Sequence, residues 1–148
     1  MKLRRGVLFA CIAVLAIVSF ADGTQAAVPA GFDDNEIRIA QWGPQTGPAA
    51  PWGSVARGSK LLFDVVNEEG GINGRKIKYF IRDDMYNPAQ TAAVVKELVE
   101  RQGVFAFVGG VGAACGMAVK DYLAANKIPW VGPSAADQDF VKPLNPYL

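Results

Sequence analysis

The chain has 148 residues, with 15 Lys or Arg, 14 Asp or Glu and no His. Without histidine it can form neither a His-dependent catalytic triad nor a His metal site, and no other metal or cofactor motif replaces them. The near-neutral charge, with no basic patch beyond the N-terminus, argues against a nucleic-acid partner. The length and the 51% of hydrophobic residues suit one domain with a substantial core.

Residues 1–26 have the pattern of a secretory signal peptide. A basic start leads into an apolar run over residues 7–20, and Thr24 and Ala26 are the small residues that signal peptidase requires before its cleavage point. The apolar run is shorter than the ~20 residues that span a bilayer, which disfavours the alternative of a retained anchor. We expect export from the cytosol and a mature chain of residues 27–148.

The two cysteines fall in different parts of the chain. Cys11 lies inside the apolar run, and apolar residues continue beyond it, so lipidation at Cys11 is the less favoured interpretation. Cys115 is then the single cysteine of the mature chain. We therefore expect no internal disulfide and a buried, unreactive thiol.

From residue 37 onward, strand patterns alternate with helix patterns. Strands are predicted at residues 37–42, 76–82, 104–108 and 128–131. Helices are predicted between and after them, at residues 55–66, 88–102 and 113–126. Asn87 followed by Pro88 is the N-cap signature of the second helix, and Gly70-Gly71 and Gly103 end the first two.

The spacing of apolar residues predicts which side of each helix faces the core. On the first helix these residues are Val55, Leu61, Leu62, Val65 and Val66. On the second and third they are Ala92, Val95, Leu98 and Val99, and Met117, Ala118, Tyr122 and Leu123.

The alternation of strands and helices predicts an α/β fold, with a parallel sheet that carries helices on both faces. In such sheets a ligand binds beyond the carboxyl ends of the strands. Four loops leave those ends and share one rim: Gly43–Gly53, Asp83–Asn87, Gly109–Ala113 and Gly132–Asp137. We expect the binding site on this rim. The residues after Ser134 read as loop.

The segment Gly110–Cys115 follows a predicted strand and opens a helix, in partial likeness to a dinucleotide-binding fingerprint. Cys115 stands where that fingerprint has Gly or Ala, and the segment belongs to the third strand–helix unit instead of the first. We interpret it as a helix N-terminus whose free backbone N–H groups receive an anionic group such as a carboxylate. The simpler alternative is a glycine turn without a ligand.

Two further features of the rim have competing interpretations. Trp52 could form an apolar wall for a ligand, or it could fold onto the core. Asp83 and Asp84 could form an acid–base pair, but adjacent residues at a strand end point in opposite directions. We favour capping and turn formation for the two carboxylates.

Several segments carry a recognisable combination of motifs. They are Gly47-Pro48 with Trp52-Gly53, the run Asn67–Ile77 with its Asn-x-x-Gly-Gly-Ile-x-Gly pattern, Asp83-Asp84 with Asn87-Pro88, Val104–Gly112 and Pro129–Ala135. In this order they resemble the leucine/isoleucine/valine-binding protein family, over roughly residues 37–148. The resemblance implies a periplasmic solute-binding component of an ABC importer with the type I periplasmic-binding (Venus-flytrap) fold. Residues 27–148 would form its first lobe, and the second lobe would be absent.

The family resemblance also implies a set of ligand-binding residues: Trp52, Gly112, Ala113, Ser134, Ala135 and Ala136. In this scheme the ligand's carboxylate meets Gly112 and Ala113, and its ammonium meets the loop that begins at Ser134. The family usually offers hydroxyl groups where this chain has Ala113 and Ala136, so Ser134 would have to accept the ammonium. A branched-chain amino acid, an aromatic or aliphatic carboxylate and an amide all remain open as ligands.

We therefore expect a monomeric, non-enzymatic binding protein that uses no cofactor and no metal. It would close on a small-molecule ligand and pass it to an inner-membrane ABC permease. The ligand-binding ectodomain of a receptor or sensor is the alternative, and a cytosolic dinucleotide-binding enzyme is a third hypothesis. A first lobe alone should bind its ligand weakly, because half of the pocket wall is absent.

Overall fold

The computed structural model describes residues 31–140, 142 and 144–148. The predicted signal peptide at residues 1–26 and the alternative lipidation site at Cys11 lie outside the described residues. In the described part of the chain, no helix combines the length and the apolar character that a membrane crossing requires.

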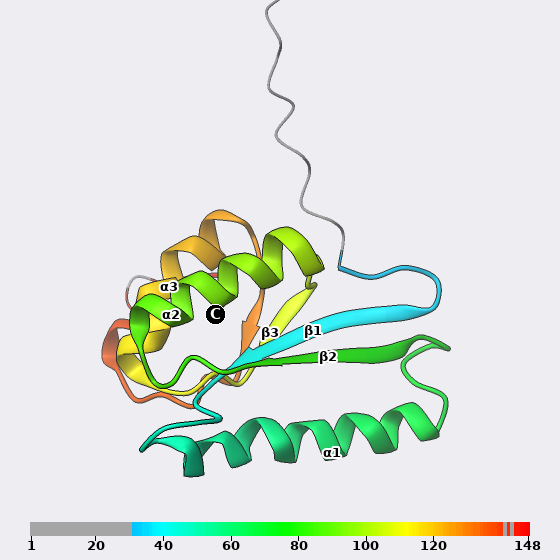
Figure 1. The fold of residues 1–148 in the computed structure, drawn as a ribbon. Helices are drawn as coiled ribbons and strands as arrows, with labels where there is room; N and C mark the ends of the chain where they lie inside the picture. The colour runs from blue at the N-terminus through cyan, green and yellow to red at the C-terminus, as the bar shows by residue number, and fades with distance from the viewer. Residues whose placement is uncertain (1–30, 141, 143) are drawn as a thin grey trace, which may run out of the picture.

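Four parallel strands form one sheet in the order β2-β1-β3-β4 (Figure 1). The strands are β1 (Glu36–Trp42), β2 (Lys76–Arg82), β3 (Ala106–Val108) and β4 (Trp130–Val131). β1 pairs with β2 over its whole length but meets β3 at only two positions, Ile39↔Ala106 and Ala40↔Phe107. The predicted α/β fold with a parallel sheet is confirmed.

β3 and β4 begin two residues later than predicted, because the residues before them close the preceding helices. The N–H of Val104 donates to the carbonyl of Leu98 (3.3 Å), and the N–H of Ile128 donates to that of Leu123 (2.9 Å). Val104 and Ile128 are both buried. The apolar side chains of these two residues led to the prediction of longer strands. In the structure they lie in the core, just after the ends of the helices.

The main helices are α1 (Ser54–Glu68), α2 (Pro88–Glu97) and α3 (Ala113–Ala125). The shorter elements are a 3-10 turn η1 (Ala50–Gly53), a π-helical continuation of α2 named η2 (Leu98–Gln102) and a 3-10 turn η3 (Gln138–Phe140) in the segment predicted as loop. As predicted, Asn87 caps α2: its Oδ1 accepts from the N–H groups of Ala89 (2.9 Å) and Gln90 (3.3 Å). Gly103, at φ 59°, ends the helix in the left-handed conformation.

Helices cover both faces of the sheet. α2 and α3 lie on one face, over a core that includes Ala40, Trp42, Val95, Leu98, Val99, Phe107, Val119, Leu123 and Trp130. α1 lies on the other face, where Phe63 and Val66 pack against Ile39 and Ile77. Figure 1 shows the two layers on either side of β1 and β2.

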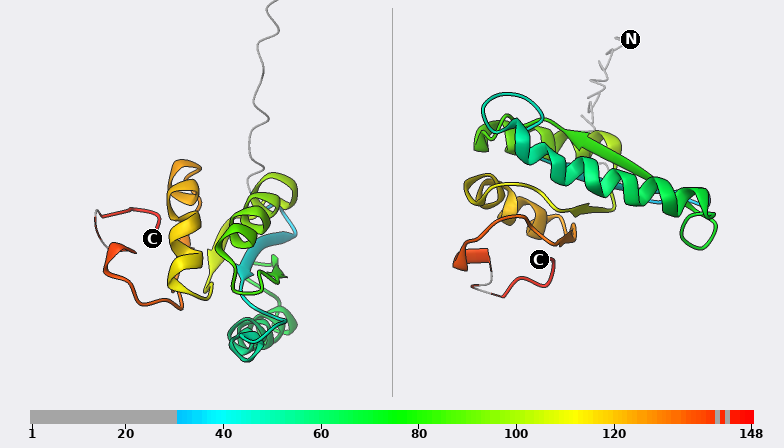
Figure 2. Two further views of the ribbon diagram at one scale, coloured as in Figure 1. Left: turned by 60° about the vertical axis from the view of Figure 1, so that its left-hand side comes forward. Right: turned by 90° about the horizontal axis from the view of Figure 1, so that it is seen from below.

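The outer side of α1 differs from the prediction. Leu61, Leu62 and Val65 are 70%, 61% and 49% exposed, whereas Phe63 and Val66 face the sheet. α1 lies over β1 and β2, and none of the described helices covers β3 and β4 on this side (Figure 2). Only a narrow stripe of α1 therefore contacts the strands. Because apolar residues cover a wide part of the helix surface, their spacing alone could not predict which of them would form that stripe.

The other two helices follow the prediction more closely. Val95, Leu98, Val99 and Leu123 are buried, and Met117 and Tyr122 pack against the core while partly exposed. Ala92 and Ala118 are exposed instead of core-facing. Alanine is small enough to occupy either side of a helix, so its position carries little information about facing.

Leucine-to-alanine substitutions should separate the core from the outer face of α1. Leu98 is 0% exposed, so we expect Leu98→Ala to lower the free energy of unfolding by about 2–5 kcal/mol through the cavity it leaves. Leu62→Ala, at a side chain 61% exposed, should change it by less than about 0.5 kcal/mol. Urea unfolding followed by circular dichroism measures both values. Equal losses would contradict the placement of Leu62 outside the core.

Candidate functional site

An open pocket of about 210 Å³ lies beyond the carboxyl ends of the strands. Its lining residues are Trp52, Tyr86, Val111, Gly112, Ala113, Ser134, Ala135 and Ala136. Each of the four rim loops identified in the sequence contributes to this lining. All six predicted ligand-binding residues lie around this one mouth, and the structure adds Tyr86 and Val111 to them.

Trp52 forms an exposed wall of the pocket. It lies in η1, where its N–H donates to the carbonyl of Ala49 (3.0 Å), and its side chain is 63% exposed. The other two tryptophans, Trp42 and Trp130, are buried in the core. Trp52 therefore does not fold onto the core, which was the alternative interpretation of this residue.

Asp83 ties two of the rim loops together. Its carboxylate accepts hydrogen bonds from the N–H of Gln45 (2.8 Å) and the hydroxyl of Thr46 in the first loop, and from the N–H of Met85 (3.0 Å) in its own loop. Partial burial would raise the pKa of Asp83. The hydrogen bonds from Thr46, Gln45 and Met85 outweigh burial and hold this pKa below its ordinary value. The charged form of Asp83 thus stabilises both loops.

Asp84 is buried and fixes the same loop from its other side. One oxygen of its carboxylate accepts from the N–H of Tyr86 (3.0 Å), and the other accepts from the hydroxyl of Thr91 in α2 (2.7 Å). Both aspartates therefore form turns and anchor neighbouring segments, in agreement with the favoured interpretation. Their side chains are occupied by these hydrogen bonds and do not form an acid–base pair.

The N-terminus of α3 opens into the pocket without a cap of its own. Gly112 is the N-cap residue, at φ 100°, and no side chain within residues 31–140, 142 and 144–148 caps the first turn of α3 with a hydrogen bond. A Cβ at position 112 would lie 2.8 Å from Cε2 of Tyr86, so only glycine fits this conformation and this contact. Ala113, the first residue of α3, lines the pocket directly. The free N–H groups at this end favour an anionic group.

The loop that begins at Ser134 lies beside the N-terminus of α3 because it extends the parallel pairing of the sheet. The N–H of Ser134 donates to the carbonyl of Gly110 (2.9 Å), and the N–H of Gly112 donates to that of Ser134 (3.3 Å). Val111 and Ser134 form an isolated parallel bridge. These bonds hold the Ser134 side chain and Ala136 next to the helix end that would receive an anion.

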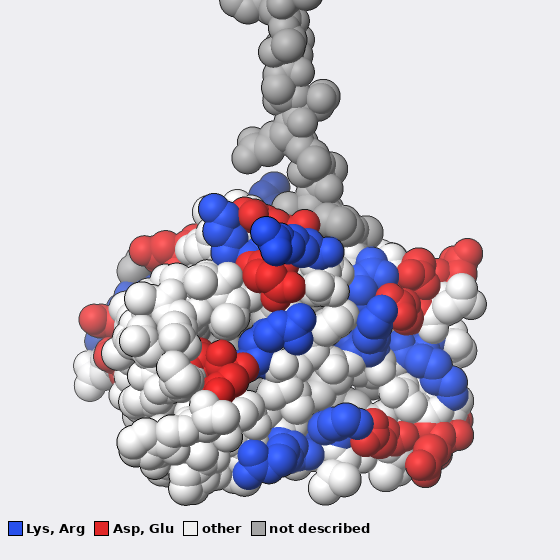
Figure 3. Space-filling model, in the orientation of Figure 1, with Lys and Arg blue, Asp and Glu red and all other residues white. Residues whose placement is uncertain are grey.

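The pocket is apolar and uncharged. None of its lining residues is Asp, Glu, Lys or Arg. Figure 3 shows that the end of the molecule where the rim loops lie, on the left in this view, is mostly free of charged side chains. A ligand at this site would meet aromatic rings, small side chains and backbone groups.

Cys115 lies just behind the pocket wall in α3 and is almost fully buried. Burial raises the pKa of its thiol, which keeps the sulfur protonated and unreactive at neutral pH. The predicted buried thiol is confirmed.

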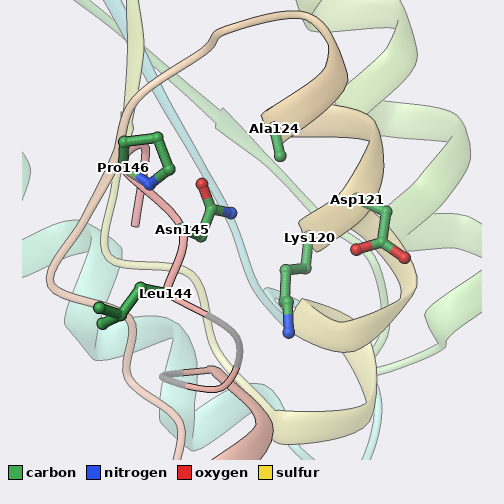
Figure 4. Close-up of a pocket in the computed structure, with 6 residues that line it drawn as sticks. All are labelled: Lys120, Asp121, Ala124, Leu144, Asn145 and Pro146. Carbon is green, nitrogen blue, oxygen red and sulfur yellow. The ribbon is translucent and has the colours of Figure 1, made fainter.

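A second pocket, of about 270 Å³, lies between α3 and the C-terminal segment (Figure 4). It is lined by Lys120, Asp121 and Ala124 of α3 and by Leu144, Asn145 and Pro146 of the C-terminal segment. The ammonium of Lys120 donates to the backbone carbonyl of Asp139, so this cation already has a partner. No residue predicted from the sequence to bind a ligand lies there, and the pocket at the rim remains the candidate site.

A family model described as periplasmic binding protein matches residues 36–147. The chain belongs to the periplasmic binding protein family. A curated relative from Pseudomonas aeruginosa, named leucine-, isoleucine-, valine-, threonine-, and alanine-binding protein, is 33% identical over 124 residues, which cover 83% of this chain and 31% of the relative. Leu/Ile/Val-binding protein homolog 3 of Brucella melitensis is 30% identical over 133 residues, which cover 89% of this chain and 33% of the relative.

Solved structures of periplasmic binding proteins share the fold. The branched-chain amino acid transporter substrate-binding protein LivJ of Streptococcus pneumoniae, in complex with isoleucine, superposes with a TM-score of 0.68 at 28% identity and covers 73% of this chain and 31% of its own. A fatty acid ABC transporter substrate-binding protein from Thermomonospora curvata gives 0.65 at 29% identity, with 73% and 27% covered. The chain thus has the architecture of the first lobe of the type I periplasmic-binding fold. It spans about a third of the length of the curated relatives it matches.

Tyr86 and Val111 are the pocket residues that the sequence analysis of this binding protein missed. Both lie in loops assigned to the rim, and Tyr86 is an aromatic residue in such a loop, which is the signal that identified Trp52. What the sequence did not reveal is that the Tyr86 ring lies against Gly112.

Replacement of Asp83 should loosen both loops that it joins. We expect Asp83→Asn to lower the free energy of unfolding by roughly 1–3 kcal/mol at pH 7, because the charged acceptor is lost. The folded-state pKa of Asp83 lies below its ordinary value of 3.8, so this stabilisation is present above that value and is lost as the pH falls through the folded-state pKa. The difference between wild type and variant should therefore shrink below about pH 4.

Urea unfolding at neutral and acidic pH measures this difference. Asp34→Asn, at an exposed position, is the control for the loss of one negative charge. A difference that is the same at both pH values would contradict the role assigned to the charged form of Asp83.

Proposed function

We propose that this chain is part of an exported solute-binding protein that captures a small organic carboxylate in the rim pocket and serves an inner-membrane ABC permease. A signal peptide at residues 1–26 would bring it to the periplasm. The ligand would be enclosed by closure of this lobe against a second one, and the closed form would be recognised by the permease.

The observation that carries this proposal is the uncapped N-terminus of α3 inside an uncharged pocket. α2 has the Asn87 side chain as its cap, whereas α3 has none and begins at Gly112 on the pocket wall. A ligand carboxylate at Gly112 and Ala113 would accept hydrogen bonds from the free N–H groups and would lie at the positive end of the helix dipole.

The remainder of the pocket supports a ligand with an apolar body. Trp52 offers a large exposed ring, and Ala135 and Ala136 offer small apolar surfaces. Ser134 is the one lining residue with an aliphatic hydroxyl, and it would accept the ammonium of an amino acid. The ligands named for these relatives, which are leucine, isoleucine, valine, threonine, alanine and a fatty acid, share a carboxylate, and all of them except threonine have a wholly apolar side chain or tail.

Trp52 provides a built-in probe for testing ligand binding. Because Trp42 and Trp130 are 0% and 2% exposed while Trp52 is 63% exposed, iodide should quench Trp52 selectively. We expect a ligand from a panel of branched-chain amino acids, aromatic carboxylates and amides to protect Trp52 from iodide. Trp52→Phe, which should abolish most of the quenching, is the control for the origin of the signal. A panel in which no compound protects Trp52 would contradict the proposed site.

The affinity of this chain for any such ligand should be weak, in the millimolar range, because residues 27–148 would supply only one side of the closed pocket. Trp52→Ala should weaken binding of an apolar ligand by a further factor of about ten, through loss of the contact with the indole ring. Thermal-shift titration measures both effects. Micromolar binding by this chain would overturn the two-lobe proposal, and unchanged affinity in Trp52→Ala would mean that the indole does not contact the ligand.

A further inference from the structure

Tyr86 is a second exposed aromatic residue that lines the pocket, and it comes from a different loop than Trp52. It follows β2, whereas Trp52 follows β1, and both rings line the same mouth. Its side chain is 47% exposed, so the ring remains accessible to a ligand from the pocket side.

The backbone holds Tyr86 in an unusual conformation that other contacts enforce. Met85 and Tyr86 have φ values of 49° and 59°, the left-handed region that residues other than glycine rarely adopt. The carboxylates of Asp83 and Asp84 accept hydrogen bonds from the backbone N–H groups of Met85 and Tyr86, respectively. These two local hydrogen bonds stabilise the unusual conformation. Asp84 is itself fixed by Thr91 of α2. These hydrogen bonds thus hold the backbone of the loop that carries the Tyr86 ring.

The Tyr86 ring lies next to the N-terminus of α3, where the ligand carboxylate would bind. Cε2 of Tyr86 lies 2.8 Å from the point where a Cβ on Gly112 would stand. An anion at the first turn of α3 would therefore lie beside the Tyr86 ring, in a pocket that Trp52 also lines. The part of the ligand next to its carboxylate would meet an aromatic surface from each of two loops.

We propose that Tyr86 is a specificity-determining residue of this site, and that with Trp52 it selects carboxylates that carry a flat aromatic group over aliphatic carboxylates and α-amino acids. This inference rests on the function proposed above. Two exposed rings in the lining of one pocket favour an aromatic body, because aromatic pairs gain contact energy beyond the area they bury. An α-ammonium finds the hydroxyls of Ser134 and Tyr86 and backbone carbonyls among the lining residues but no carboxylate, so its desolvation is poorly compensated.

The test compares three probes: phenylacetate, 4-methylpentanoate and leucine. The first two differ in the aromatic ring, and the last two have the same aliphatic body and differ in the ammonium. Titration of the ¹⁵N-labelled chain, followed by NMR at the backbone amides of Ala113–Cys115, measures millimolar affinities. We expect phenylacetate to bind about threefold to tenfold more tightly than 4-methylpentanoate, and leucine to bind most weakly.

Two variants assign the preference to the ring. Tyr86→Phe keeps the aromatic surface and should retain the preference for phenylacetate. Tyr86→Leu keeps an apolar side chain but not the ring, and should reduce the preference to less than about twofold. A preference that survives in Tyr86→Leu, or that is absent from wild type, would overturn the role of Tyr86 while leaving carboxylate binding intact. If no probe shifts these amides in any variant, both the inference and the proposed function are overturned.

A ligand-free measurement tests the contact itself. Gly112→Ala should lower the melting temperature, both because of the φ of 100° and because its Cβ meets the Tyr86 ring. In the background of Tyr86→Ala the second cause is removed, so the same substitution should cost less. Equal decreases in the two backgrounds would mean that Tyr86 does not lie over Gly112, and would overturn its placement.

Discussion

Parallel pairing along β1 is the constraint on which the rest of this structure depends. β1 is bonded to β2 on one side and to β3 on the other, and β3 pairs in turn with β4. Because all four strands run in the same direction, the loops that leave them open at the same end of the sheet. Residues as distant in sequence as Trp52 and Ser134 therefore line one pocket. The pairing continues beyond the strands through the bridge between Val111 and Ser134, which closes the pocket wall.

The conformation of the rim loops depends on the carboxylates of Asp83 and Asp84 and on Gly112. Asp83 joins the loop of Trp52 to the loop of Tyr86, and Asp84 joins the latter to α2. Gly112 then allows α3 to begin without a capping side chain, directly beneath the Tyr86 ring. The free backbone N–H groups at this point are the polar groups that this uncharged pocket could offer to an anion.

The two faces of the sheet are covered to different extents. The face of α2 and α3 holds the larger buried core, whereas α1 covers only the β1–β2 half of the other face (Figure 2). Leu62 and Val65 of α1 and Val131 of β4 are left exposed there. Parallel sheets are ordinarily covered on both faces, so these exposed apolar side chains depart from the usual arrangement. The chain matches about a third of the length of its relatives.

The sequence by itself determined the order of strands and helices, the parallel sheet and the four loops of the rim, because hydrophobic period, glycine stops and the N-cap at Asn87 are local signals. The resemblance to a known family, and not these local signals, indicated the six pocket residues. The sequence also indicated the family, through motifs that resemble those of leucine/isoleucine/valine-binding proteins. Only the tertiary structure decided which stripe of α1 faces the strands, that Val104 and Ile128 close helices, and that Tyr86 lies over Gly112. Each of these depends on contacts between segments distant in the chain, where the geometry of packing selects among side chains that look equivalent in the local pattern.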